Sequence, residues 1–362
     1  MLSFQLTAFE FHFFFVSLRP IMESLLGKTK DELKLVAQEV GLPSFAASQL
    51  AQWLYQRGAA SLDEMTNISK KAREALTERY VVGRMEPLDV QRSVDGTAKY
   101  LFPVSCGGQV ETVFIPDADR GTVCVSCQVG CKMRCEFCMT GRQGFHGNLS
   151  AGDILNQLYS LPERDRITNV VFMGQGEPFD NLDSVLRATE LLQADYGWAW
   201  SPKRITVSTV GLKKGMERFL EESQCHLAVS LHNPFPEERA EMIPAERAWS
   251  LTEFLNVLKA YDWTHQRRLS FEYTVFHGLN DRPAHVRELC RLLGRMECRV
   301  NLIRCHEIPE SRFRPAPEQT MEWIRDELSR HGITCTIRAS RGQDIYAACG
   351  LLNSSRSVVH SS

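Results

Sequence analysis

From residue 121 onward, short apolar runs rich in β-branched residues alternate with amphipathic helical stretches. The apolar runs are TVCVSC, ITNVVFMG, RITVSTVG, HLAVSLH, LSFEYTVF, RVNLIRCH and TCTIRAS. The helical stretches are ILNQLYSL, NLDSVLRATELL, LTEFLNVLKAYD, AHVRELCRLLGRM and EQTMEWIRDELSRH. Such βα repetition predicts a mostly parallel sheet covered by helices. About six repeats are present, fewer than in a complete eightfold barrel, so we predict an α/β fold with a partial (βα)6 barrel.

In such folds the functional residues lie at the carboxyl ends of the strands. Residue types that bind ligands or react fall at these ends in this chain, and they are Cys124, Gly176, Ser208, His232 and His306. We therefore expect one site along this edge of the sheet.

The segment 22–84 reads as a small helical domain. Apolar residues recur at helical spacing within residues 30–40, 45–55 and 68–80, with Gly and Pro between these stretches.

Residues 85–120 form a short β-rich segment in this interpretation, because runs such as KYLFPV and QVETVFIP alternate between apolar and polar residues. The barrel core is predicted to span 121–350, and the tail 351–362 is expected to be disordered.

The first 21 residues are apolar and aromatic but are interrupted by Glu10 and His12. They lack the basic start and cleavage site of a signal peptide, and they are too interrupted for a membrane helix. Met22 opens a more ordinary start, so residues 1–21 are expected to be an extension outside the fold.

Composition narrows the cellular setting. The formal net charge is -2, so contacts with nucleic acid must depend on local basic patches. Twelve cysteines in 362 residues are too sparse for a secreted disulfide scaffold. We expect a cytoplasmic protein with no membrane partner, in which clustered thiols hold metal or do chemistry.

Cys131, Cys135 and Cys138 follow the pattern C-x3-C-x2-C. Three thiolates can hold three irons of a [4Fe-4S] cluster and leave the fourth iron open to another ligand. The alternative is zinc, but a structural zinc site needs four ligands, usually in paired arms, and no fitting second arm is present. Inert buried cysteines are the simplest alternative, although three thiols this close are prone to oxidation.

This spacing resembles the signature of the radical S-adenosylmethionine (radical SAM) superfamily, and the partial barrel agrees with it. The resemblance implies that SAM binds the open iron and is cleaved to a 5'-deoxyadenosyl radical. The stretch VVFMGQGEP adds Gly176 and Glu177 after a strand. Glycine permits close approach of a ligand to the backbone, and a carboxylate can accept the SAM ammonium group.

Four motifs together resemble the RlmN/Cfr family of dual-specificity RNA methyltransferases, from about residue 22 to about residue 352. They are CVSCQVGCKMRCEFCMTGRQGFHGNL, GQGEP, AVSLHNP and RGQDIYAACG. The resemblance implies a cysteine relay that uses two SAM molecules per turnover. Cys349 would take a methyl group, its methylene radical would add to adenine, and Cys124 would release the product by forming a disulfide. Glu111 matches the family's proton acceptor, although by itself it reads more readily as a solvated strand carboxylate.

The resemblance also assigns SAM contacts, which are Gly176, Glu177, Ser208, Ser230, Leu231, His232 and His306. His306 departs from the pattern, because many members carry asparagine there. Cys127 also departs, where many members have serine; it is either a spare thiol or a small core residue.

By resemblance, the RNA targets are adenine 2503 of 23S ribosomal RNA and adenine 37 of some transfer RNAs, and an electron donor such as flavodoxin supplies the reductant. Basic residues that could contact RNA are Lys28, Lys30, Lys70, Lys71, Arg73, Arg79, Lys203, Arg204, Lys213 and Lys214. Three functions stay open: methylation of adenine carbon 2, methylation of carbon 8 as in the antibiotic-resistance branch, and RNA binding by a non-catalytic iron–sulfur or zinc protein. The full helical start favours carbon 2, and the presence of Cys124 and Cys349 argues against the third.

Overall fold

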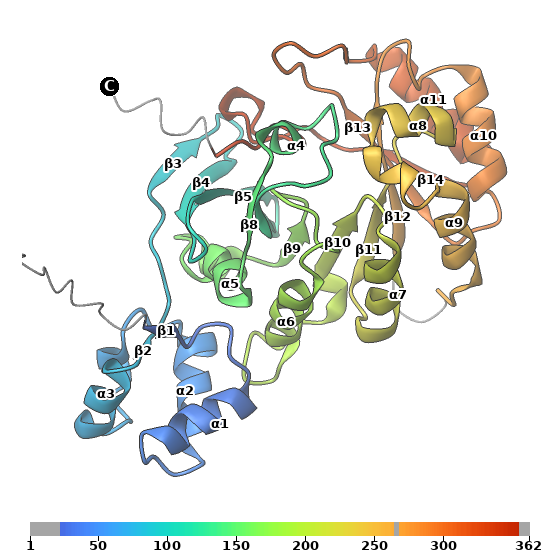
Figure 1. Ribbon diagram of the computed structural model, residues 1–362. Helices are drawn as coiled ribbons and strands as arrows, with labels where there is room; N and C mark the ends of the chain where they lie inside the picture. The colour runs from blue at the N-terminus through green and yellow to red at the C-terminus, as the bar shows by residue number, and fades with distance from the viewer. Residues whose placement is uncertain (1–21, 264–267, 355–362) are drawn as a thin grey trace, which may run out of the picture.

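The computed structural model describes residues 22–263 and 268–354. The predicted extension 1–21 and the end of the predicted disordered tail, residues 355–362, lie outside the described residues. Within the described chain, a ten-stranded sheet has the order β14-β13-β12-β11-β10-β9-β6-β5-β4-β3. Figure 1 shows this sheet with helices packed on its outer side and a separate group of helices at the lower left.

The parallel part of the sheet confirms the predicted α/β class. Its strands are β6 (Arg120–Cys124), β9 (Asn169–Phe172), β10 (Ile205–Thr209), β11 (His226–Ser230), β12 (Leu269–Val275), β13 (Arg299–Arg304) and β14 (Thr334–Ile337). Every neighbouring pair in this series is parallel. Each strand corresponds to one of the apolar runs in the sequence, and the carboxyl ends therefore meet along one edge.

Helices connect consecutive strands on the outside of this sheet. They are α5 (Ala151–Tyr159), α6 (Leu182–Gln193), α7 (Lys213–Glu222), α8 (Pro236–Met242), α9 (Leu251–Ala260), α10 (Pro283–Leu293) and α11 (Glu318–Arg330). The sequence pattern predicted α5, α6, α9, α10 and α11 but not α7 or α8.

The β-rich segment extends the main sheet instead of standing apart from it. Strands β3 (Asp89–Arg92), β4 (Ala98–Pro103) and β5 (Gln109–Asp117) pair antiparallel with one another in this order. β5 also pairs antiparallel with β6, the first strand of the parallel series. Residues of this segment can therefore reach the same edge of the sheet as the barrel residues.

A small two-stranded ladder, β7 (Gln128–Gly130) with β8 (Phe145–Asn148), brackets the cysteine motif and the short helix α4 (Met139–Gln143). The sequence pattern did not predict it. Because both strands are anchored, the cysteine-bearing loop between them has fixed ends.

The helical module contains α1 (Lys30–Glu39), α2 (Ala46–Ala51), a π-helical turn (Gln52–Arg57), a 3-10 turn (Leu62–Glu64) and α3 (Lys70–Thr77), closed by the pairing of β1 (Glu23–Ser24) with β2 (Tyr80–Val81). Thr29 caps α1 in a capping box with Glu32. The module packs on the core through Arg187, which pairs with Glu32 at 2.5 Å, and Arg164, which donates to the carbonyl of Gln56 at 2.8 Å.

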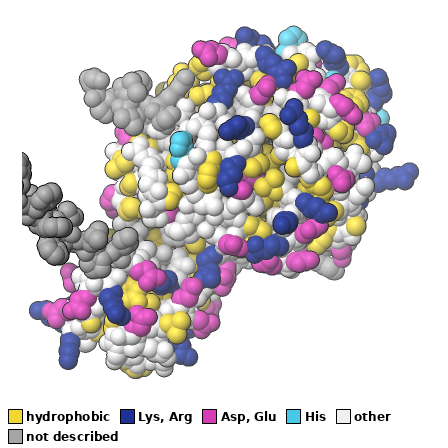
Figure 2. All heavy atoms as spheres, viewed as in Figure 1, with side chains coloured by type: hydrophobic (Ala, Val, Ile, Leu, Met, Phe, Trp, Pro, Cys, Tyr) yellow, Lys and Arg dark blue, Asp and Glu magenta, His cyan; other side chains and the backbone are white. Residues whose placement is uncertain are grey.

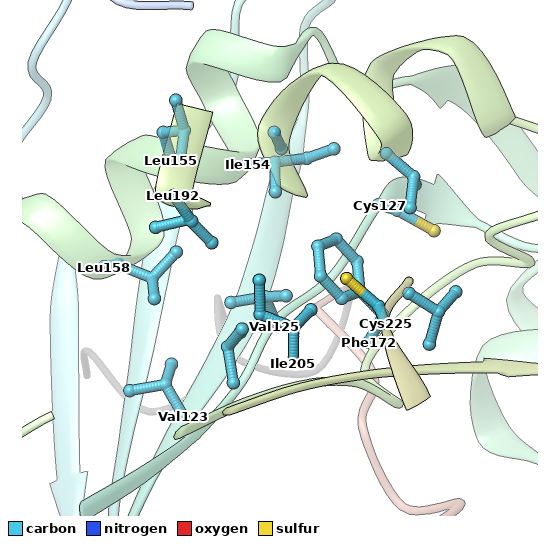
Figure 3. Packing of buried hydrophobic residues seen from close by; sticks show 14 of the residues in the cluster. Val123, Val125, Cys127, Ile154, Leu155, Leu158, Phe172, Leu192, Ile205 and Cys225 are labelled. Carbon is cyan, nitrogen blue, oxygen red and sulfur yellow. The ribbon is translucent and has the colours of Figure 1, made fainter. Parts of the chain in front are cut away.

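One continuous apolar core lies between the sheet and its helices. Figure 3 shows Ile154, Leu155 and Leu158 of α5 facing Val123 of β6 and Phe172 of β9. Each buried side chain of this kind contributes roughly 1.5–3 kcal/mol to folding. In the part of the chain that the structure describes, no helix is both long and apolar enough to span a membrane.

Candidate active site

A cavity of about 990 Å³ opens at the carboxyl ends of the parallel strands. Most residues assigned to cluster or SAM binding line it, namely Cys131, Cys135, Cys138, Gly176, Glu177, Ser208, Ser230, His232 and His306. We call this the first cavity.

The three motif cysteines lie on the loop between β7 and α4. The thiol sulfur of Cys131 accepts the backbone N–H of Met133 at 3.5 Å, and the N–H of Cys138 donates to the carbonyl of Cys135 at 3.1 Å. The first of these contacts stabilises a thiolate at Cys131, and the second fixes the turn that carries Cys135 and Cys138. Among the described residues, no three Cys, His, Asp or Glu side chains converge on one metal-ion position. A [4Fe-4S] cluster does not need such convergence, because each thiolate binds a different iron. The three cysteines, all open to the first cavity, therefore fit a cluster bound there.

Gly176 has φ +100°, a conformation that glycine adopts readily. A Cβ at this position would lie 2.6 Å from the Cβ of Gln128 and 2.8 Å from its backbone nitrogen. Glycine thus allows the turn after β9 to pack directly against β7.

Glu177 is buried beside this turn. Its two carboxylate oxygens accept the backbone N–H groups of Phe179 and Val210, each at 3.0 Å. Burial raises the pKa of Glu177 to about 7, although these N–H bonds and the Thr209 side chain oppose the shift. The carboxyl group borders the cavity, so it can pair with a cationic ligand group there.

His232 follows β11 in the left-handed backbone region, with φ +53°. The amide of Asn280 donates to its carbonyl at 2.6 Å, which stabilises this conformation. The N–H of Thr274 donates to Nδ1 at 2.9 Å, so the neutral ring carries its proton on Nε2. Burial and the nearby Arg239 lower the pKa of His232 to about 3, so the ring stays neutral at physiological pH.

Leu231 lies between Ser230 and His232, which both line the first cavity. Leu231 itself is not among the described residues that line it. It is fully buried, and its carbonyl accepts Nε of Arg239 at 3.0 Å. Arg239 also donates to the carbonyls of Val210 and Ser230 and pairs with the buried Glu246. This arginine, which sequence reasoning missed, joins the ends of β10 and β11 under the cavity.

A second cavity of about 1140 Å³ lies beside the first. Cys349, His306, Met173 and Ile303 line both cavities, while Cys124 lines only the second. Cys349 is therefore exposed, with cavity space on two sides. Desolvation by the neighbouring protein atoms raises the pKa of its thiol. Burial, together with the nearby Cys349, raises the pKa of Cys124 to about 12.

Glu111 is buried in the middle of β5. Its carboxylate pairs with Nζ of Lys99 at 2.9 Å and accepts the backbone N–H of Asn353 at 2.6 Å. In the described chain it is absent from the walls of both cavities, whereas Leu352, next to its partner Asn353, lines the second. The solvated-carboxylate interpretation of Glu111 is wrong, because only 1% of the residue is exposed.

Two charged residues on the sheet were missed by the sequence reasoning. Nη1 of Arg338 lies 3.3 Å from Oε2 of Glu272. Glu272 lines the first cavity and Arg338 the second, so the pair spans the boundary between them. The amide of Asn301 fixes Glu272 at 2.8 Å. A strand glutamate followed much later by an arginine gives no local signal of such a pair.

Cys127 packs in the apolar core, in agreement with the simpler of its two interpretations (Figure 3).

Several basic residues considered for RNA contact have partners inside the protein. Lys28 pairs with Glu23, Arg79 pairs with Glu39, and Arg73 donates to backbone carbonyls. On the face in Figure 2, basic and acidic side chains are interspersed. Any contact of this face with nucleic acid would therefore depend on small local groups of cations.

Known proteins resemble this chain over nearly its whole length. Residues 125–293 match the radical SAM superfamily, and residues 23–82 match the ribosomal RNA large subunit methyltransferase N-terminal domain. A Bacteroides fragilis protein is 58% identical over 332 residues, covering 92% of this chain and 96% of that protein. A Phocaeicola vulgatus protein is 56% identical over 333 residues, covering 92% and 95%. Both bear the name "Probable dual-specificity RNA methyltransferase RlmN".

The crystal structure of a radical SAM methyltransferase from Sphaerobacter thermophilus superimposes with a TM-score of 0.87 at 37% identity. The match covers 92% of this chain and 99% of that one. The chain therefore belongs to the RlmN family of radical SAM RNA methyltransferases and is a SAM-dependent enzyme.

Proposed function

We propose that this enzyme methylates carbon 2 of adenine, at position 2503 of 23S ribosomal RNA and position 37 of transfer RNA, through a cysteine relay. The observation that carries the proposal is the place of Cys349, which borders both cavities, while Cys124 borders only the second. One sulfur can then face SAM on one side and the target base on the other.

The first cavity is the proposed cofactor site. Cys131, Cys135 and Cys138 would hold a [4Fe-4S] cluster, which when bound supplies the electron that cleaves SAM. The proposed SAM contacts are Gly176, Glu177, Ser208, Ser230, Leu231, His232 and His306. The buried Glu177 suits the SAM ammonium group, and the Nε2–H of His232 is a hydrogen-bond donor at the edge of the same cavity.

The relay begins when the Cys349 thiol loses its proton to solvent and the thiolate attacks the methyl carbon of one SAM. A sulfur–carbon bond forms on Cys349, the methyl–sulfonium bond breaks, and S-adenosylhomocysteine leaves. Loss of a hydrogen atom from the S-methyl group, to the radical derived from a second SAM, lets the remaining carbon bond to adenine carbon 2. The odd electron of this adduct would return to the bound cluster that supplied it. Two SAM molecules are thus consumed per turnover. The Cys124 thiolate then attacks the Cys349 sulfur and forms a Cys124–Cys349 disulfide. The sulfur–carbon bond breaks, its electron pair goes to the carbon bound to adenine, and a proton from solvent completes the new methyl group. An external reductant such as flavodoxin restores the thiols.

Glu111 is the proposed acceptor of the proton that leaves adenine carbon 2. Its Asn353 contact lies beside Leu352, which lines the second cavity. Movement of this C-terminal segment would let the carboxylate reach a bound base. Nζ of Lys99, 2.9 Å away, holds the carboxylate in place.

Each segment of the chain has a proposed role, and the enzyme is proposed to act in the cytoplasm. Residues 22–84 form an accessory RNA-binding domain, 85–120 a β-rich extension, and 121–350 the radical SAM core. A cytoplasmic enzyme would meet both RNA substrates.

Nucleoside mass spectrometry tests this function. Reconstituted enzyme with SAM, reductant and unmodified 23S RNA is expected to give 2-methyladenosine. 8-Methyladenosine would replace the proposal with the carbon-8 alternative, which uses the same thiols. SAM cleavage without any methyladenosine would refute both.

A further inference from the structure

A β-turn near the start of the sheet is tied to the loop that carries Cys349. The turn, residues 93–97, connects β3 to β4. Asp344 accepts the hydroxyl of Ser93 at 2.6 Å and the backbone N–H of Val94 at 3.3 Å. In the opposite direction, Asp95 accepts the backbone N–H of Gly342 at 2.9 Å. We call these reciprocal bonds the turn–loop clasp.

A hydrogen bond inside the turn orients the carboxylate of Asp95. The second oxygen of Asp95 accepts the backbone N–H of Thr97 at 2.9 Å. Partial burial alone would raise the pKa of Asp95, but the N–H groups of Gly342 and Thr97 outweigh it and lower the pKa to about 2. Ionised acceptors make the stronger hydrogen bonds. Gly342 has φ +62°, and a Cβ there would lie 2.9 Å from Cγ2 of Thr97, so the loop packs directly on the turn.

A second anchor lies just beyond Cys349. The backbone N–H of Met139 donates to the carbonyl of Gly350 at 2.8 Å, and the hydroxyl of Thr140 donates to the carbonyl of Leu352 at 2.8 Å. Cys349 is therefore held between a turn of the β-rich segment and the helix that follows the cluster cysteines.

We propose that Asp95 and Asp344 are positioning residues for Cys349, a role that rests on the proposed relay. The relay requires one sulfur to reach a methyl donor in the first cavity and Cys124 in the second. A loop fixed only beyond Cys349 would sample many thiol positions, which lowers the fraction of time in a reactive geometry. The clasp fixes the other end, so the thiol stays at the boundary between the cavities.

The test compares the variants Asp95→Ala, Asp344→Ala and Asp344→Asn with Asp119→Ala. Asp344 is exposed, so its removal leaves the core intact. Asp344→Asn keeps an oxygen for the Ser93 hydroxyl. Asp119, an exposed carboxylate in the turn between β5 and β6, is the matched control.

Two quantities are measured on reconstituted, full-length holoenzyme under anaerobic conditions. The first is the rate at which oxidised glutathione, the oxidant, converts the Cys124 and Cys349 thiols to a disulfide, followed by mass spectrometry of unreduced digests. The second is kcat and KM for RNA methylation.

Both alanine variants of the clasp are expected to form the disulfide about tenfold or more slowly and to lose kcat by a similar factor, with KM within about twofold. Asp344→Asn should fall between them and the wild type, and Asp119→Ala should match the wild type. An unchanged disulfide rate in Asp344→Ala would overturn the proposal, as would equal slowing in Asp119→Ala. If a Cys349→Ser enzyme still methylates RNA, the relay fails, while the disulfide rates still report on the clasp.

Discussion

The backbone N–H of Met139 donates to the carbonyl of Gly350 at 2.8 Å. Met139 follows Cys138, the last cysteine of the C-x3-C-x2-C motif, and Gly350 follows Cys349. One main-chain hydrogen bond therefore joins the proposed cluster loop to the proposed methyl carrier, although more than two hundred residues separate them in sequence. This bond therefore couples the position of the loop that carries the motif cysteines to the position of the loop that carries Cys349.

Replacement of Cys349 by alanine is expected to abolish RNA methylation, because no other thiol of the described chain lines both cavities. Iron content, the cluster absorbance and SAM binding should stay at wild-type levels, since the three motif cysteines remain. Cys106→Ala, which removes an exposed thiol from the turn between β4 and β5, is the control. Methylation by the Cys349 variant at the wild-type rate would contradict the relay.

Cys124→Ala should accumulate a covalent protein–RNA adduct, because the thiol that releases the product is missing. The adduct would appear as a slow band on a denaturing gel and collapse with ribonuclease. Cys127→Ala serves as the control: Cys127 lies three residues away but packs in the core, so it should form no adduct. An adduct of equal yield in both variants would argue against Cys124 as the resolving thiol.

Gly176→Ala is expected to destabilise the protein and weaken SAM binding. A left-handed backbone at a non-glycine residue costs roughly 1–3 kcal/mol, and the new Cβ would also collide with Gln128. Gly332→Ala is the matched control, because Gly332 has φ +80° with no atom within 4 Å of the added Cβ. Thermal denaturation should show a larger loss for Gly176→Ala; equal losses would mean that the close approach to β7 is unimportant.

The pH dependence of stability should reveal Glu177. Burial raises its pKa from 4.5 to about 7 in the folded protein, so folding favours the protonated form. Its contribution is fully present below pH 4.5 and is lost as the pH rises through about 7. Relative to Glu177→Gln, the SAM-free wild type should lose on the order of 3 kcal/mol of stability between about pH 4 and about pH 8.

Denaturant unfolding of the wild type and of Glu177→Gln, each at the two pH values, measures this difference. The effects of other titrating groups are the same in the two proteins and cancel in the comparison. A stability difference that does not change with pH would contradict the buried, perturbed carboxyl group. At about pH 8 the same variant should bind SAM more weakly than the wild type, because the amide carries no charge to pair with the ammonium group.

The parallel strands could be predicted because each reads as a short apolar run rich in β-branched residues. The central strands β11 and β12 are buried at nearly every position, as such runs predict. Helix α7 could not, because Gly215 interrupts its pattern and the adjacent lysines suggested an RNA patch. Gly215 is needed there, since a Cβ would lie 2.5 Å from the Cβ of Phe179. Packing thus outweighs the helix penalty of glycine, which is about 1 kcal/mol.

In the site, the motif cysteines and the residues at strand ends could be placed from sequence because strand order brings them to one edge. The Arg338–Glu272 pair and the turn–loop clasp could not. Their partners are 66 and about 250 residues apart, and neither pair has a periodic pattern. The burial of Glu111 was likewise hidden, because the sequence does not show that β5 becomes an interior strand once β6 pairs with it.

The most direct test of the relay follows one methyl group through Cys349. Enzyme whose Cys349 carries a trideuteriomethyl group, prepared with labelled SAM, is given unlabelled SAM, reductant and unmodified RNA for a single turnover. If Cys349 carries the methyl group, the first 2-methyladenosine contains two deuterium atoms, because one is abstracted and a proton from solvent replaces it. A first product with an unlabelled methyl group would show that the group comes directly from the second SAM, and the account would be wrong.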